Sequence, residues 1–367
     1  MKKRKVRVGI IFGGRSAEHE VSLQSAKNIV EAIDKRKYEV VLIAVDKKGR
    51  WLLPGSSKFL LQAENPRLIK LHRSATSVVL TPNAGAAQLV SLSDHRPVGK
   101  VDVMFPILHG PFGEDGTVQG LLKLANIPYV GPDVLGSAIG MDKDAQKRLL
   151  REAGIPVAKF QVLRRSTYTR KDLVKIIKNL GLPLFVKPAN LGSSVGISKV
   201  KSKNAFLKAI KEAFAYDNKI MVEEYIKGRE IECSVLGNEE PRASIPGEVI
   251  PQHEFYSYEA KYIDEKGAIL EIPAKLPKST IRKVQKLAVK TFKTLCCEGM
   301  ARVDLFLTGK GKVYVNELNT IPGFTKISMY PKLWEASGIS YTKLIDRLIS
   351  LAIERHERDG KLKTSYR

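Results

Sequence analysis

The chain has few cysteines and no long apolar run. Its three cysteines, Cys233, Cys296 and Cys297, show no CxxC spacing, so neither a disulfide framework nor a structural zinc site is indicated. The adjacent pair is expected to be packed core rather than a nucleophile. No uncharged apolar segment approaches the roughly 20 residues of a membrane span, and no small-residue cleavage pattern follows the basic start. We expect a soluble, cytoplasmic protein that does not bind membranes.

Acidic residues are also scarce relative to basic ones. The chain contains 62 Lys and Arg against 38 Asp and Glu, a formal net charge of +24. Such an excess is compatible with binding to a phosphate backbone. However, the basic residues are scattered over predicted helix faces, as at Arg170, Lys171, Lys175 and Lys178, and no zinc finger or long basic tail accompanies them. We therefore expect anionic small substrates and no nucleic-acid partner.

Two common nucleotide fingerprints are absent. The pair Gly13-Gly14 follows a strand-like run, but the third glycine of GxGxxG is missing, which opposes a nicotinamide oxidoreductase. The small-residue loop at 192–196 is not followed by the Gly-Lys-Ser/Thr of a P-loop. A nucleotide site in this chain must therefore use a different motif.

The pattern of apolar residues indicates a mixed α/β protein. Residues 6–12 read as a buried strand, a helix with apolar residues at helical spacing follows, and 38–45 supply the next strand. Residues 101–108 and 118–125 repeat the strand-loop-helix order, so we predict an open, mostly parallel sheet. Residues 53–87 have poor periodicity, and their structure is left open.

Beyond about residue 140 the pattern changes to an α+β arrangement with antiparallel strands. The length suits two or three domains better than one. We predict an N-terminal α/β substrate-binding domain at 1–138, a central subdomain at 139–224, a C-terminal subdomain with a metal site at 225–356 and a basic tail at 357–367.

The strongest chemical signal is a predicted hairpin. Arg302 and Asp304 share one face of its first strand, and Glu317 and Asn319 share one face of its second. A two-residue turn at 310–311 would place Asp304 opposite Glu317 and Arg302 opposite Asn319, whereas a three-residue loop without a bulge would break this register. Two carboxylates and an amide are hard oxygen ligands that Mg²⁺ accepts, and an arginine could stabilise an oxyanion. The alternative is a salt-bridge ladder on an exposed sheet face.

Two weaker signals precede the hairpin. A strand ending in Lys187 enters the loop 192–196, where backbone N–H groups and a lysine could hold phosphate, although such loops are often only turns. Glu223 and Glu230 lie at a strand end and just past a turn, where a carboxylate could accept from a ribose hydroxyl or simply be solvated.

Read in order, several segments resemble D-alanine:D-alanine ligases over about residues 6–350. They are 13–22 (GGRSAEHEVS), 109–110 (HG), 113–116 (GEDG), 141–143 (MDK), 186–188 (VKP), 192–196 (GSSVG), 258–262 (YEAKY) and 319–323 (NTIPG). The resemblance implies an ATP-grasp fold of three domains with ATP held between the central and C-terminal ones. It implies ATP-dependent joining of two D-alanines through D-alanyl phosphate, for peptidoglycan precursors, with a homodimer as the expected assembly.

The resemblance also implies roles for the nucleotide and metal sites. Lys143 and Lys187 match phosphate-contacting lysines, Glu230 the ribose carboxylate, and Glu223 a residue near the adenine. The ligands of two Mg²⁺ ions, for which Mn²⁺ is a substitute, match the hairpin residues Asp304, Glu317 and Asn319.

Further matches concern the substrates. Glu18 matches the residue that engages the first D-alanine's ammonium, and Ser328 the residue that meets the second D-alanine's carboxylate. Arg302 and the Gly323 backbone match the oxyanion stabilisers. The implied hydrogen-bonded trio that closes a loop carrying Lys261 consists of Ser193, Tyr262 and Glu18. A sibling ligase that uses D-lactate or D-serine is the closest alternative.

Overall fold

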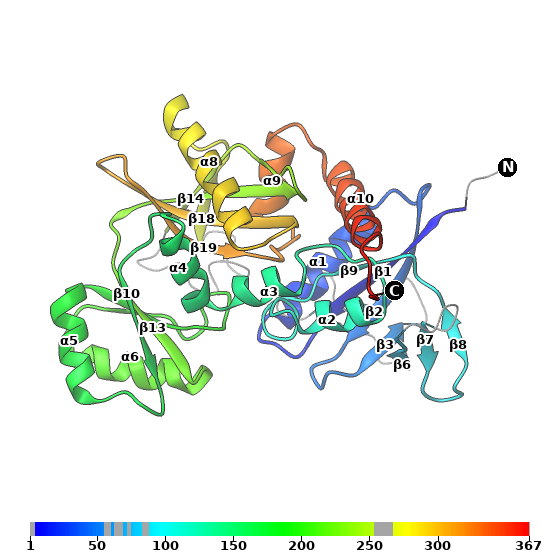
Figure 1. Ribbon diagram of the computed structural model, residues 1–367, viewed down its shortest axis with the longest axis horizontal. Helices are drawn as coiled ribbons and strands as arrows, with labels where there is room; N and C mark the ends of the chain where they lie inside the picture. Colours follow the sequence, from blue (N-terminus) through cyan, green and yellow to red (C-terminus); the bar gives the residue numbers. More distant parts are fainter. Residues whose placement is uncertain are drawn as a thin grey trace.

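The structure is a computed structural model that describes residues 4–54, 60–61, 69–71, 75–82, 88–252 and 267–366. Among these residues the strands form sheets of seven, four and six strands and one two-stranded pair. The three larger sheets follow one another along the chain, and helices cover them (Figure 1). No helix in these ranges is long and apolar enough to cross a membrane.

The seven-stranded sheet has the order β8-β7-β6-β3-β2-β1-β9. Its strands are β1 (Val6–Gly13), β2 (Tyr38–Val45), β3 (Trp51–Pro54), β6 (Ala75–Leu80), β7 (Leu89–Ser91), β8 (Pro97–Gly99) and β9 (Val103–Pro106). β2 and β9 flank β1 in parallel, as predicted for residues 6–12, 38–45 and 101–108, but the sheet as a whole is mixed rather than mostly parallel. The remaining pairings are antiparallel. Part of the segment whose structure the sequence left open therefore extends the sheet, and the short strands β4 (Leu60–Leu61) and β5 (Lys70–Leu71) pair with each other.

Helices cover both faces of this sheet. α1 (His19–Ala32) packs on one face together with α10 (Tyr341–Asp359) from the far end of the chain, and α2 (Thr117–Leu124) belongs to the apolar cluster on the other face. β1 is buried along most of its length, as expected for a central parallel strand with helices on both sides. The first and last parts of the chain thus share one core.

The four-stranded sheet has the order β10-β13-β11-β12 and is antiparallel. Its strands are β10 (Phe160–Arg164), β11 (Leu184–Pro188), β12 (Ser198–Val200) and β13 (Lys219–Glu224). α5 (Arg170–Leu180) and α6 (Lys203–Tyr216) bury their apolar sides against it. α5 starts at a capping box in which the Thr169 and Asp172 side chains satisfy each other's backbone N–H groups.

The six-stranded sheet is built on the path β17-β16-β14-β18-β19, with β15 paired to β14. Its strands are β14 (Gly228–Gly237), β15 (Arg242–Ala243), β16 (Gly247–Pro251), β17 (Ala268–Glu271), β18 (Gly299–Thr308) and β19 (Val313–Asn319). α8 (Lys278–Thr294) packs on it, α9 (Met329–Ala336) contacts β14, and α3 (Val134–Met141) leads into α4 (Lys143–Glu152) beside β19. The predicted antiparallel hairpin therefore lies in this sheet.

Candidate active site

The hairpin β18–β19 has the predicted register near its chemically important residues. Asp304 pairs with Glu317, and Arg302 pairs with Asn319. The connection is not the two-residue turn considered for this register, because Thr308 donates its backbone N–H to the Lys312 carbonyl across a three-residue loop. A bulge next to Asp304 leaves Asn316 as an extra residue and restores the register. The four side chains face one another because two irregularities compensate.

Arg302 and Asp304 are already joined across this face. The guanidinium donates to both carboxylate oxygens of Asp304, at 2.7 Å each, and the Asn319 amide donates to one of them at 3.0 Å. Glu232 on β14 lies opposite Asp304 and forms an ion pair with Arg302 at 2.9 Å. Glu232 was not among the residues predicted for the site, although its alternation with Glu230 along one strand places both on the same face. Arg302 is thus fixed between two carboxylates.

The donor set fits a divalent cation. Asp304, Glu317 and Asn319 supply hard oxygens on one face, and phosphate oxygens would complete the coordination that Mg²⁺ takes. Within the described ranges, no group of three acidic, histidine or cysteine side chains could hold a metal alone. Lys143 lies at the edge of this set, with its ammonium 3.7 Å from a Glu317 oxygen and 2.5 Å from the Leu191 carbonyl.

A buried charge cluster lies behind Lys187. Glu223 accepts from Lys187 at 2.7 Å with one oxygen and contacts the Lys147 ammonium with the other, and all three side chains are almost fully buried. Burial opposes ionisation of Glu223, but the two lysines outweigh it and lower the pKa of this carboxyl. Burial likewise opposes the charge on Lys187, yet Glu223 and Glu317 raise its pKa. Glu223 is therefore held as a carboxylate.

Lys147 was missed by the sequence analysis. Its only signal is the spacing of four residues from Lys143, which places both on one face of α4. Burial lowers the pKa of Lys147, and Glu223 contacts its ammonium. Two lysines from different elements thus share one carboxylate.

A cavity of 420 Å³ opens next to this cluster, between the four-stranded and six-stranded sheets. Its walls include Lys187, Glu223, Glu230 and Glu317, so four of the predicted site residues line one space. Glu224 also lines it, but this side chain accepts the backbone N–H of Lys159 at 2.7 Å. The cavity is lined both by charged side chains and by apolar ones such as Phe185 and Ile250, and a nucleotide requires both.

The small-residue loop reaches back to the start of the chain. Ser193 donates its hydroxyl to a carboxylate oxygen of Glu18, which is buried at the beginning of α1. Ser193 and Ser194 have φ values of 49° and 61°, a left-handed conformation that is uncommon outside glycine and frequent at functional sites. Two members of the predicted trio therefore touch. The third, Tyr262, and the neighbouring Lys261 lie outside the described residues.

Two side chains hold the segment that leads to Gly323. A Glu114 oxygen accepts the Ile321 N–H at 3.1 Å, and the His109 Nδ1 lies 3.1 Å from the Ile321 carbonyl, to which it must donate because a carbonyl only accepts. Burial lowers the pKa of His109 to about 4, so the ring is neutral. Burial and the nearby Glu18 raise the pKa of Glu114 to about 8. The backbone N–H and the carbonyl of Ile321 are therefore both held by side chains.

Gly323 itself lies close to Ser328. A Cβ at Gly323 would stand 2.7 Å from the Ser328 Oγ, so a larger residue would displace the hydroxyl. The Ser328 Oγ accepts the Thr325 N–H at 3.0 Å and lies 2.8 Å from the Thr325 Oγ1. Ser328 precedes α9 without capping it through its side chain. Gly323 and the Ser328 hydroxyl therefore form one compact unit.

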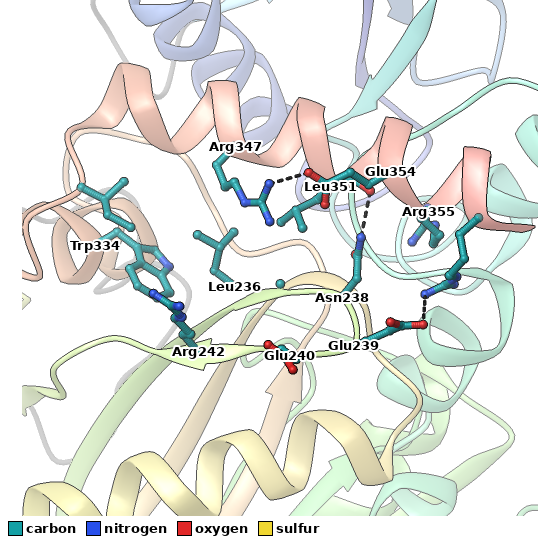
Figure 2. Close-up of a pocket in the computed structure, with 13 residues that line it drawn as sticks. Leu236, Asn238, Glu239, Glu240, Arg242, Trp334, Arg347, Leu351, Glu354 and Arg355 are labelled. Carbon is teal, nitrogen blue, oxygen red and sulfur yellow. Dashed lines mark hydrogen bonds and ion pairs between the residues drawn. The ribbon is translucent and has the colours of Figure 1, made fainter.

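A larger cavity, of 700 Å³, lies elsewhere, between β14–β15 and α10 (Figure 2). It shares no lining residue with the 420 Å³ cavity. Its charges are mostly paired with one another: Arg347 binds Glu354 at 2.6 Å, and Arg358 lies 3.6 Å from Glu239. A ligand would have to displace these pairs, and none of the predicted site residues lies there.

Comparison with known proteins agrees with this geometry. The family model described as D-ala D-ala ligase N-terminus matches residues 7–132, and that of D-ala D-ala ligase C-terminus matches residues 149–350. The chain is 59% identical over 361 residues to the D-alanine–D-alanine ligase of Shouchella clausii (strain KSM-K16), covering 98% of each chain. It is 54% identical to D-alanine–D-alanine ligase A of Escherichia coli (strain K12), covering 98% of this chain and 99% of that one.

Solved structures give the same result. A D-alanine-D-alanine ligase from Coxiella burnetii superimposes with a TM-score of 0.85 at 43% identity, covering 98% of this chain and 97% of that chain. VanG D-Ala:D-Ser ligase from Enterococcus faecalis superimposes with a TM-score of 0.83 at 36% identity, covering 95% of this chain and 100% of that chain. Together with the two family models, these similarities show that the chain belongs to the D-alanine–D-alanine ligase family, with the ATP-grasp fold.

Proposed function

We propose that this enzyme joins two D-alanines at the expense of ATP, and that the dipeptide serves peptidoglycan precursor synthesis. The observation that carries the proposal is the cavity whose walls unite Lys187, Glu223, Glu230 and Glu317 in a member of this ligase family. This cavity offers a lysine for phosphates and a carboxylate for a ribose within one space.

The chemistry requires activation because a carboxylate has no adequate leaving group. The carboxylate oxygen of the first D-alanine attacks the γ-phosphorus, the bond from that phosphorus to ADP breaks, and D-alanyl phosphate forms. The amine of the second D-alanine then attacks the acyl carbon and loses a proton. Collapse of the tetrahedral oxyanion expels inorganic phosphate and leaves the new amide bond.

The residues of this chain divide these tasks. Lys143 and Lys187 neutralise phosphate oxygens, and Glu230 accepts from the ribose. Glu223 holds Lys187 in place at 2.7 Å and is assigned to the adenine end of the nucleotide. Lys261, from the segment outside the described residues, is assigned to the phosphates on the resemblance alone.

The substrate residues form a second group. Glu18, supported by Ser193, receives the ammonium of the first D-alanine, and Ser328 receives the carboxylate of the second. Arg302 and the backbone N–H of Gly323 face the oxyanion, where loss of one donor typically costs on the order of 10²-fold in rate. Tyr262 completes the closure with Ser193 and Glu18 and keeps water from the acyl phosphate.

Two Mg²⁺ ions, held by Asp304, Glu317 and Asn319, would neutralise phosphate charge during transfer. We further propose a cytoplasmic homodimer, and three domains with boundaries near residues 138 and 224 followed by the tail at 357–367. D-alanine and ATP are the proposed partners, with no nucleic acid and no membrane among them.

The test is an acceptor panel with purified enzyme, ATP and Mg²⁺. D-alanine, D-serine and D-lactate are offered at equal concentration, phosphate release is followed, and products are separated by mass. We expect D-alanyl-D-alanine to dominate at neutral pH and its rate to rise toward alkaline pH, because only the free amine attacks. The similarity to VanG makes D-serine the second candidate acceptor. Predominance of D-alanyl-D-serine or of an ester would overturn the substrate assignment.

A further inference from the structure

The outer helix of the six-stranded sheet carries positive charge without compensation. α8 contains six basic residues and no acidic one. All six are exposed: Lys278, Arg282, Lys283, Lys286, Lys290 and Lys293. The opposite side of the helix, including Val284, Ala288 and Phe292, is buried against the sheet. Figure 1 shows α8 at the outside of the molecule, so its basic side faces solvent.

A groove runs beside this basic side. It has a volume of 440 Å³ and is lined by Arg282, Lys283, Lys286 and Lys290 together with Ser279. The remaining lining residues are apolar: Pro156, Leu287 and Val313. Among the residues that the structure describes, no acidic or aromatic one lines the groove, and none is shared with the proposed nucleotide cavity.

Two of the lysines are fixed across the groove. Lys283 donates to the Gly311 carbonyl at 3.0 Å, and Lys290 donates to the Ala153 carbonyl at 2.7 Å. Each ammonium has three donors, so each keeps donors for a ligand. In the part of the chain that the structure describes, neither forms an ion pair with a carboxylate. The groove therefore presents positioned cations that lack an anionic partner.

We propose that this groove binds an acidic, extended polypeptide segment of another protein. Lys283 and Lys290 are seven residues apart on the helix, a rise of about 10.5 Å, which is close to the roughly 9 Å that three residues span in an extended polyproline II chain. Because that conformation has three residues per turn, carboxylates three residues apart lie on one side of the chain and could reach both lysines, while the apolar side chains between them could contact Leu287 and Val313. Such a segment would therefore contact both the basic and the apolar residues that line the groove.

Nucleic acids and anionic membranes fit the basic and apolar lining of this groove less well than an acidic polypeptide. Single-stranded nucleic acid binds grooves in which bases stack on aromatic side chains, and none is present. A duplex is too wide to enter a groove of 440 Å³ and would contact only its rim. An anionic membrane is approached by helices whose exposed side carries large apolar residues for insertion, but the apolar residues of α8 are turned toward the sheet.

The experiment measures binding of a fluorescent peptide of about twelve residues, with glutamate at every third position and leucine or alanine between, long enough to span the groove when extended. Its glutamine counterpart is the ligand control. The test variant replaces Arg282, Lys283, Lys286 and Lys290 by glutamine. The control variant replaces four exposed basic residues of α5 by glutamine: Arg170, Lys171, Lys175 and Lys178. Each variant lowers the formal net charge from +24 to +20 (24 − 4).

We expect the α8 variant to bind the acidic peptide about tenfold more weakly or worse, as four exposed charge contacts are lost, and the α5 variant to bind within about threefold of the unchanged chain. Ligase activity of both variants should remain, since no proposed site residue is altered. The inference is overturned by three results: no binding of the acidic peptide, equal losses in both variants, or a larger α8-dependent affinity for vesicles of phosphatidylglycerol or for single-stranded or duplex DNA. Because ligase activity is measured separately, failure here leaves the proposed function untouched.

Discussion

Glu223 should contribute more to stability than either lysine that contacts it. Its carboxylate balances Lys147 and Lys187, and all three side chains are nearly inaccessible to water. Glu223→Gln leaves two buried ammonium groups without the carboxylate that is bonded to both. Removing one partner of a buried ion pair typically costs about 3–5 kcal/mol. At about 2–4 °C per kcal/mol for a chain of this size, the midpoint of thermal unfolding should fall on the order of 10 °C.

The control variant is Lys147→Met. Methionine has nearly the same volume as lysine, so this change removes a positive charge of the cluster with little change in packing. It leaves Glu223 paired with Lys187 at 2.7 Å, so the remaining buried charges still balance. We expect a loss below about half of that of Glu223→Gln, consistent with the tolerance of cores for volume-conserving replacements.

Both variants are compared by calorimetry near pH 7, with ATP binding measured in parallel. The folded pKa of Glu223 is lowered, so its contribution is present at neutral pH and is lost as pH falls through that value. The difference between Glu223→Gln and the unchanged chain should therefore shrink in acid. Equal losses in the two variants, or a difference that does not depend on pH, would refute the charge-balance argument.

Three further predictions concern the site. Glu317→Gln should fold normally but lose Mg²⁺-dependent turnover, since an amide holds a divalent ion less well; unchanged activity at ordinary Mg²⁺ would contradict this. Glu114 has a folded pKa raised from 4.5 to about 8, so it favours the folded state below pH 4.5 and this contribution is lost as pH rises toward 8. Glu114→Gln should flatten the decline of the unfolding midpoint across that interval, and an unaltered slope would exclude a raised pKa. Tyr262→Phe should increase phosphate release relative to dipeptide formed, because a looser closure admits water; an unaltered ratio would remove Tyr262 from the closure.

The hairpin shows how far alternation along a strand can predict a site. Alternation along each strand placed Arg302 with Asp304 and Glu317 with Asn319, and the pairing of Asp304 with Glu317 is the one expected from a two-residue turn. The loop 309–311 has three residues instead, and the pairing is kept because the bulge at Asn316 offsets the extra loop residue. Turn residues such as glycine can be recognised in a sequence, but the position of a bulge cannot, because it depends on how the strand pairs with its neighbour.

The residues that the sequence analysis missed are those whose role is created by packing. Lysines usually lie at the protein surface, and nothing near Lys147 in the sequence suggests otherwise. Its side chain is nevertheless only 1% exposed, because β13 places Glu223 against α4. Glu232 lies next to Arg302 because β14 is adjacent to β18. Neither contact is local in sequence. Spacing alone identified the strands and helices but not which of them would meet.

The segment at Gly323 shows why the site depends on the whole fold. The Phe324 N–H donates to Ser25 on α1 at 3.2 Å, and the Phe324 carbonyl accepts from Asn28 at 3.0 Å and from Tyr341 at 2.7 Å. The Phe324 ring lies edge-on to Phe105, with centroids 6.0 Å apart. The backbone of Phe324, next to Gly323, is thus held by α1 and α10, and its ring packs on β9. Because the proposed oxyanion donor is a backbone N–H, its position follows from this shared core. The geometry of the proposed catalytic site therefore depends on the packing of the first sheet against the C-terminal helices.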